Sequence, residues 1–176
     1  GQRGFDLIGE AKSQFAAREG SIIEVCAVGQ RMMSDIAARI VAEGGAFLVI
    51  DYGYTQTSLG DSLQAVARHA YVDPLAEPGE ADLTAHVDFA ALARAARAQG
   101  AKVMGPVTQA HFLLQLGIER RAESLAKKAT PEQAQSIYDA LERLTGTQDA
   151  RRHMGDLFKV MAVTHPEMPD LPGFFE

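Results

Sequence analysis

The sequence predicts an α/β fold whose central sheet is mainly parallel. Three observations lead to this prediction. Apolar segments of strand length alternate with amphipathic segments of helical period, glycines separate many of them, and one apolar run suits a strand covered on both faces. The length of 176 residues is that of one domain.

A strand, a helix and a second strand are predicted near the start of the chain. Residues 21–28 (SIIEVCAV) are rich in β-branched side chains and lie between two glycines, which predicts a strand. Residues 31–43 carry apolar side chains at helical spacing, and two glycines then end the predicted helix. Residues 46–51 (AFLVID) are a near-continuous apolar run, typical of a strand buried on both faces. Together these segments predict a βαβ unit.

The following segment, residues 52–82, has the composition of a loop. It contains three glycines and two prolines, and a short helix is predicted around residues 61–68. Because a connection of this length is unusual inside a compact domain, we expect a functional loop or lid.

The alternation of strands and helices resumes after this loop. Residues 83–87 predict a strand, and the alanine-rich residues 89–99 predict a helix that ends at a glycine. Residues 101–109 predict a short strand interrupted by Pro106.

Helices dominate the next part of the chain. Residues 110–129 have a helical pattern with a break near Gly117. The sequence Thr130-Pro131-Glu132-Gln133 is typical of a helix start and predicts a helix that runs to about Leu144. Residues 157–163 (LFKVMAV) predict a last strand. The proline-rich tail, residues 164–176, is expected to wrap around the surface.

Composition excludes several classes of function. The net charge is -6 and the Lys and Arg side chains are scattered, so no basic face is expected for nucleic acid. The longest apolar run, residues 46–50, is too short to span a membrane, so no membrane insertion is expected. The five histidines lack metal-ligand spacing, and no metal site is predicted.

Asp51, Tyr52 and Gly53 follow the most hydrophobic predicted strand. In open α/β sheets, ligands bind outside the carboxyl ends of the strands, where a carboxylate can hold a cation. The alternative is an ordinary turn, because Asp often ends a strand and glycine tolerates positive φ.

Other candidate residues lie in and after the long loop. His69 and Asp73 could exchange protons beside a cleft, whereas the alternative is that Asp73 only starts a turn and His69 is a surface residue. His86 and Asp88 flank a predicted strand end, and Asp88 is better placed as the N-cap of the next helix.

Three stretches of the chain resemble one known family. They are GGAFLVIDYGY, GDSLQAVARHAYVDPLAEPGEADLTAHVDFAAL and GPVTQAHFLLQLGI, and they look like the C-terminal half of the MidA family of S-adenosylmethionine-dependent methyltransferases. This family includes a mitochondrial arginine methyltransferase that assists the assembly of respiratory complex I. The resemblance runs from about Ile22 to residues 157–163, and its middle string is long and specific.

The resemblance implies the C-terminal part of a Rossmann-like class I methyltransferase fold. On this template residues 46–51 are the fifth strand of a seven-stranded sheet, and residues 157–163 are the final antiparallel strand. The family's glycine-rich cofactor loop belongs to a preceding half, and residues 1–20 do not supply it. Residues 1–176 are therefore expected to be the C-terminal part of a single methyltransferase domain, inactive alone, with unknown cofactor-binding residues and an apolar surface prone to self-association.

The resemblance also implies a function and a set of site residues. The parent protein would be an arginine N-methyltransferase acting on a protein substrate, such as a complex I subunit, in the bacterial cytoplasm or the mitochondrial matrix. Asp51 is the best partner for a substrate guanidinium, and Tyr52 could supply a hydroxyl or an aromatic face. His69, Asp73 and His86 are second choices. The alternatives are a non-enzymatic assembly or binding module on the same fold, and a different α/β transferase.

Overall fold

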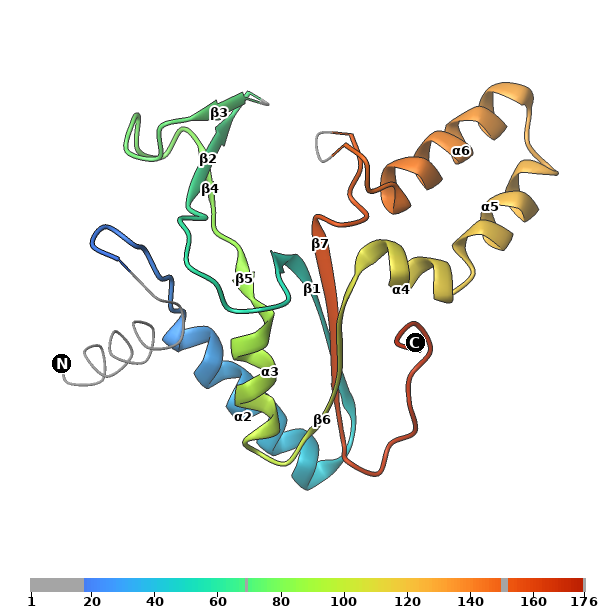
Figure 1. Ribbon diagram of the computed structural model, residues 1–176. Helices are drawn as coiled ribbons and strands as arrows, with labels where there is room; N and C mark the ends of the chain where they lie inside the picture. Colours follow the sequence, from blue (N-terminus) through green and yellow to red (C-terminus); the bar gives the residue numbers. More distant parts are fainter. Residues whose placement is uncertain (1–17, 69, 150–151, 176) are drawn as a thin grey trace.

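The computed structural model describes residues 18–68, 70–149 and 152–175. In chain order the elements are α2 (Ala27–Glu43), β1 (Ala46–Tyr54), β2 (Gln64–Ala67), β3 (Ala70–Val72), β4 (Asp82–Thr84), β5 (Val87–Asp88), α3 (Phe89–Arg97), β6 (Lys102–Thr108), α4 (Gln109–Gln115), α5 (Ile118–Ala126), α6 (Pro131–Thr145) and β7 (Phe158–Thr164). They form a main sheet with helices and a smaller sheet above one end of it (Figure 1).

The main sheet has the strand order β5-β1-β7-β6. β1 and β5 are parallel, whereas β7 is antiparallel to both β1 and β6. Three of these strands therefore run in one direction and β7 runs in the other. The last strand of the chain lies between β1 and β6, which confirms the predicted mainly parallel sheet with a final antiparallel strand.

The core lies between the main sheet and the helices α2 and α3. Buried apolar side chains from both helices and from β7 form one cluster, which includes Met33, Ala37, Phe89, Met161 and Val163. Alanines fill much of α3, and their small side chains let this helix lie close to the sheet.

The opposite face of the sheet is covered unevenly. The C-terminal segment contacts the β6 side, where the Lys102 ammonium donates to the carbonyl of Met168 at 2.9 Å. On β1, by contrast, Leu48 and Ile50 are 44% and 48% exposed. The prediction that this strand is buried on both faces is therefore wrong among the described residues, because no helix covers its second face.

The predicted strand over residues 21–28 is also wrong. α2 already begins at Ala27, and the Cys26 Sγ accepts a hydrogen bond from the Gly29 backbone N–H at 3.3 Å as an N-cap. Among the described residues no strand pairs with this segment. Instead it contacts the long loop, where the Gly60 N–H donates to the Ile22 carbonyl at 2.9 Å. The proposed βαβ unit thus lacks its first strand here.

The loop predicted over residues 52–82 contains regular structure. β1 continues to Tyr54, and β2, β3 and β4 form a three-stranded antiparallel sheet. The helix expected around residues 61–68 is instead β2, whose backbone pairs on both sides. The strand predicted over residues 83–87 is divided, because β4 belongs to the small sheet and β5 to the main sheet.

In the second half of the chain, the breaks and the helix start that the sequence predicts are present in the structure. The bond between Gly105 and Pro106 is cis, and the pairing of β6 with β7 shifts register there. Gly117 adopts φ 82° between α4 and α5, as the predicted break requires. Thr130 and Gln133 form the predicted capping box of α6. Within the described ranges, no helix has the length and apolarity needed to cross a membrane.

Candidate active site

β1 carries the first predicted site residue, Asp51, which lies three residues before the strand ends at Tyr54. The side chain is exposed, and its Oδ1 accepts a hydrogen bond from the Tyr52 backbone N–H at 2.7 Å. Its Oδ2 has no hydrogen-bond partner in the described part of the chain. Across the sheet, Asp51 pairs with Lys159 of β7, and burial lowers the pKa of this ammonium, while the charge of Asp156 acts in the opposite sense. Asp51 is therefore an accessible carboxylate within β1, and the prediction that it closes the strand is wrong, because the strand continues to Tyr54.

Tyr52 lies on the other face of the sheet. Successive side chains of a strand point to opposite faces, so Asp51 and Tyr52 diverge. The Tyr52 ring stacks on Phe158, its register partner in β7, with ring centroids 4.2 Å apart and planes inclined at 34°. The structure therefore does not bring these two candidates together around one substrate group.

Gly53 is required where β1 meets β5. A Cβ at this position would overlap the Val87 carbonyl oxygen and would lie 2.8 Å from the Phe89 ring. The absence of a side chain thus lets β5 and the start of α3 come close to the end of β1.

Of the remaining predicted residues, Asp73 has the geometry of a turn. Its Oδ1 accepts from the Leu75 N–H at 2.9 Å, and its carbonyl accepts from the Ala76 N–H at 3.0 Å. It directly follows β3 of the small sheet, whereas Asp51 belongs to β1 of the main sheet. His69 lies outside the described residues.

His86 belongs to a polar clip between three separate segments. Its backbone N–H donates to the Ser62 Oγ at 2.9 Å, and this hydroxyl in turn donates to the Glu24 carboxylate. The other Glu24 oxygen accepts from the Ser62 N–H at 3.0 Å. The residues before α2, the loop after β1 and the β4–β5 connection are thereby tied together.

Asp88 organises a second clip. Its Oδ1 accepts from the Ala91 N–H at 2.9 Å, which confirms the predicted N-cap of α3. Its Oδ2 accepts from the Thr57 hydroxyl at 2.6 Å, and the same hydroxyl receives a hydrogen bond from Arg94 at 3.2 Å. Asp88 therefore holds the loop after β1 as well as the helix.

Tyr54 lies between the two clips. It ends β1 opposite Asp88 in the parallel register with β5. Burial raises the pKa of its phenol, and the negative charges of Asp88 and Glu24 raise it further. The Tyr54 phenol therefore stays protonated at neutral pH.

Sequence reasoning missed Glu24, Tyr54, Thr57, Ser62 and Arg94. Glu24 gave a usable signal, since it is the one charged residue in the apolar stretch of residues 21–28. Thr57 and Ser62 are ordinary polar loop residues, and no pattern distinguishes them before the loop is folded.

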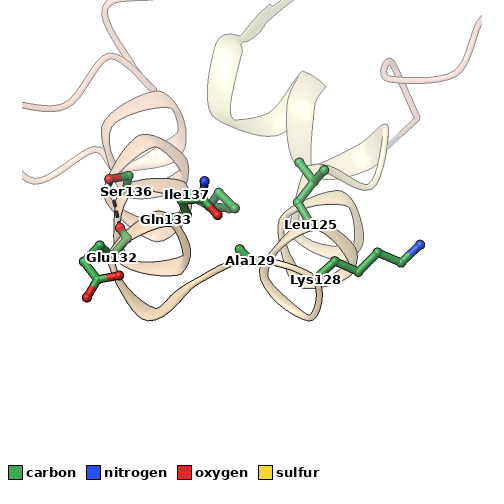
Figure 2. A pocket seen from close by; sticks show the side chains of 7 residues that line it. All are labelled: Leu125, Lys128, Ala129, Glu132, Gln133, Ser136 and Ile137. Carbon is green, nitrogen blue, oxygen red and sulfur yellow. Dashed lines mark hydrogen bonds between the residues drawn. The ribbon is translucent and has the colours of Figure 1, made fainter.

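Two hollows of the surface lie away from these residues. One of about 600 Å³ lies between α5 and α6, and Figure 2 shows Leu125 and Ile137 on its two sides, with Lys128 and Glu132 pointing outward. A second of about 430 Å³ is lined by His111, Leu114, Gln115 and Arg120. In the described residues, no group of three potential metal-ligating side chains occurs.

Comparisons with known proteins give a consistent result. A sequence model of the family described as "putative S-adenosyl-L-methionine-dependent methyltransferase" matches residues 6–107. A Drosophila melanogaster protein named protein arginine methyltransferase NDUFAF7 homolog, mitochondrial, is 38% identical over 135 residues, which are 76% of this chain and 30% of that protein. The Danio rerio protein arginine methyltransferase NDUFAF7, mitochondrial, is 34% identical over 141 residues, which are 80% of this chain and 32% of the relative.

A solved structure shows the same relationship in three dimensions. A Burkholderia thailandensis protein bound to S-adenosyl-homocysteine superposes with a TM-score of 0.65 at 30% identity. The superposition covers 82% of this chain and 38% of that protein. The chain thus spans about a third of the length of the proteins it matches.

Proposed function

The chain belongs to the MidA family of S-adenosylmethionine-dependent methyltransferases, and from that premise we propose that it is part of an enzyme that methylates arginine side chains of a protein substrate. The observation that carries the proposal is the family match over residues 6–107, joined by relatives whose names specify arginine methylation. β7 supports it, because the methyltransferase template implies a final antiparallel strand and β7 is antiparallel to both of its neighbours.

The cofactor is S-adenosylmethionine, which supplies the methyl group when it is bound. A nucleotide-type cofactor commonly sits on a glycine-containing joint between a strand and a helix. The two direct strand-to-helix joints of the described residues, at Asp88–Phe89 and Thr108–Gln109, contain no glycine. The described residues therefore do not form such a cradle, and we assign the cofactor to parts of the enzyme outside them.

Asp51 is the residue that we assign to the substrate guanidinium. It is exposed in the second half of β1, and the planar guanidinium fork matches a carboxylate. Its hydrogen bond from the Tyr52 N–H fixes one oxygen and leaves the other turned to solvent or substrate. Holding the nucleophilic nitrogen in one orientation favours an in-line displacement.

The other candidates have supporting parts in the proposal. Tyr52 acts through its stacking on Phe158, which fixes the end of β1 against β7. His86 and His69 remain candidates for the rim of the site, with His86 held by its backbone hydrogen bond to Ser62. Asp73 is the weakest candidate for a role at the site, because its hydrogen bonds from the Leu75 and Ala76 N–H groups belong to a turn.

The names of the relatives support a proposal for the location, and the family resemblance supports one for the protein substrate. Two relatives carry names that place them in mitochondria. We propose the mitochondrial matrix as the location in a eukaryote and the cytoplasm in a bacterium, and a respiratory complex I subunit as the substrate.

The product of the complete gene tests the function. It would be incubated with methyl-labelled S-adenosylmethionine and a complex I preparation, and the proteins would then be hydrolysed to amino acids. The proposal expects the label in methylarginine. Label in methyllysine alone, or none in protein, would contradict it.

A further inference from the structure

The loop that follows β1, residues 55–63, is tied to the rest of the structure at three points. The Thr57 hydroxyl is hydrogen-bonded to the start of α3. The Gly60 N–H donates to a backbone carbonyl of the segment before α2 at 2.9 Å, and Ser62 is bonded to Glu24 of the same segment. Anchors spaced in this way along a loop restrict the conformations that it can adopt.

The loop and Asp51 lie on the same side of the main sheet. Phe47 and Val49 pack against the core cluster that α2 and α3 cover, and Asp51 follows them at the two-residue spacing of one strand face. The loop passes the start of α3 (Figure 1), and Thr57 bonds to Arg94 in the second turn of this helix. The loop therefore lies near the carboxyl end of β1, where ligands bind in α/β domains.

Thr57 joins an anion and a cation through one hydroxyl group. Its only side-chain proton goes to the Asp88 Oδ2 at 2.6 Å, and its oxygen accepts from the Arg94 guanidinium at 3.2 Å. Hydrogen bonds to charged groups are stronger than those between neutral groups. The second oxygen of Asp88 caps α3 through the Ala91 N–H, so the two tasks of this carboxylate fall on different atoms.

We propose that Asp88 is a positioning residue for the protein substrate, which acts through Thr57 to hold the loop after β1 in the conformation that receives this substrate. The inference rests on the proposed function, with Asp51 as the guanidinium partner. When only a fraction of a protein is in its binding-competent conformation, the apparent affinity falls by that fraction. Release of the loop therefore raises KM for the protein substrate and leaves kcat and KM for S-adenosylmethionine unchanged.

Thr57→Val in the product of the complete gene is the first test, with the complex I preparation as the methyl acceptor. The change keeps the shape and removes the hydroxyl, and the apparent KM for the acceptor should rise roughly tenfold at constant kcat. Thr57→Ser restores the hydroxyl and should return KM to the native value. Thr147→Val makes the same change at an exposed threonine after α6 and should leave KM unchanged. A fall in kcat at constant KM would overturn the proposal.

Asp88→Asn separates the cap from the contact with Thr57. Asparagine is also a favoured N-cap residue, so α3 keeps its cap, whereas the charge that binds the Thr57 hydroxyl is lost. The apparent KM should rise as in Thr57→Val, and the double variant should show no further rise, because both changes break one contact. Additive effects would overturn the claim that Asp88 acts through Thr57.

Amide exchange gives a measurement that does not depend on methyl transfer. Exchange in residues 55–58 should become roughly tenfold faster in Thr57→Val and stay unchanged in Thr147→Val. Unchanged exchange in Thr57→Val would overturn the inference, and so would an unchanged KM of this variant in an active enzyme. An unaltered protein that forms no methylarginine would instead overturn the proposed function, and the positioning role with it.

Discussion

Asp51 and Tyr52 are adjacent in sequence, yet the pleat of β1 directs them to opposite faces of the sheet. Sequence position suggested that both would meet the same substrate group. In the structure the exposed carboxylate of Asp51 lies on one face of the sheet, and the Tyr52 ring packs on Phe158 on the other face. At the scale of single residues, Asp51 is therefore the side chain whose replacement is most informative.

Asp51→Asn, made in the product of the complete gene, should lower arginine methylation by roughly ten- to a hundredfold. The change keeps the shape and removes the charge, and a hydrogen bond to a charged group is worth about 1.5–3 kcal/mol. The melting temperature should change little because the side chain is exposed. Turnover with saturating protein substrate and Tm would be measured together, and full activity would remove Asp51 from the mechanism.

Asp73→Asn is the matched control. Asparagine can still accept the hydrogen bond from the Leu75 N–H, so a residue that only shapes a turn should leave turnover nearly unchanged. A loss equal to that of Asp51→Asn would transfer the guanidinium role to Asp73.

Tyr54 makes a prediction about alkaline pH. Its folded-state pKa is raised above the ordinary value of 10.0, so the folded protein holds this proton more tightly than the unfolded chain does. The resulting stability is complete below pH 10 and is lost as the pH rises through the folded-state pKa. Urea titrations from pH 8 to about pH 11 should therefore show a steeper loss of stability in the native chain than in Tyr54→Phe. Parallel curves for the two proteins would contradict this.

At the scale of elements, strong local signals predicted structure well. The capping sequence at Thr130 and the apolar runs of residues 46–51 and 157–163 gave α6, β1 and β7 near their observed bounds. The β-branched run at residues 21–28 predicted a strand that the structure does not contain. A strand also needs a neighbouring strand to pair with, and here Cys26 instead caps α2. β2 was missed because its residues, QAVA, have weak β propensity and depend on β3 and β4.

The clip between Glu24, Ser62 and His86 is the element-scale feature that the sequence did not reveal. Ser62→Ala removes one hydroxyl that serves two partners, one of them a carboxylate. The free energy of unfolding should fall by about 1–3 kcal/mol, and amide exchange in residues 55–63 should become faster.

Ser58→Ala provides the comparison for this clip, because Ser58 is an exposed residue of the same loop. Its effect on the free energy of unfolding should stay within about 0.5 kcal/mol. If Ser62→Ala has no larger effect in the same urea titration, the clip does not hold the loop.

At the scale of the whole molecule, the candidate site is assembled from segments far apart in the chain. Glu24, Ser62 and Asp88 meet near the end of β1 only after the sheet and the loop have formed. The strand-end rule located Asp51 without a structure, whereas the two clips depend on contacts that span 24 to 38 positions. The local pattern therefore singled out Asp51 as a candidate, whereas the contacts made by the surrounding loop could not be predicted before the chain is folded.

We propose that this chain carries the substrate side of a methyltransferase whose cofactor is held by other parts of the enzyme. Titration calorimetry with S-adenosylmethionine tests it most directly, performed on the 176-residue chain and on the product of the complete gene. We expect binding in the micromolar range for the complete product and weak or no binding for the chain, whose direct strand-to-helix joints in the described residues lack glycine. Micromolar binding by the 176-residue chain would contradict the claim, and so would the absence of binding by the complete product.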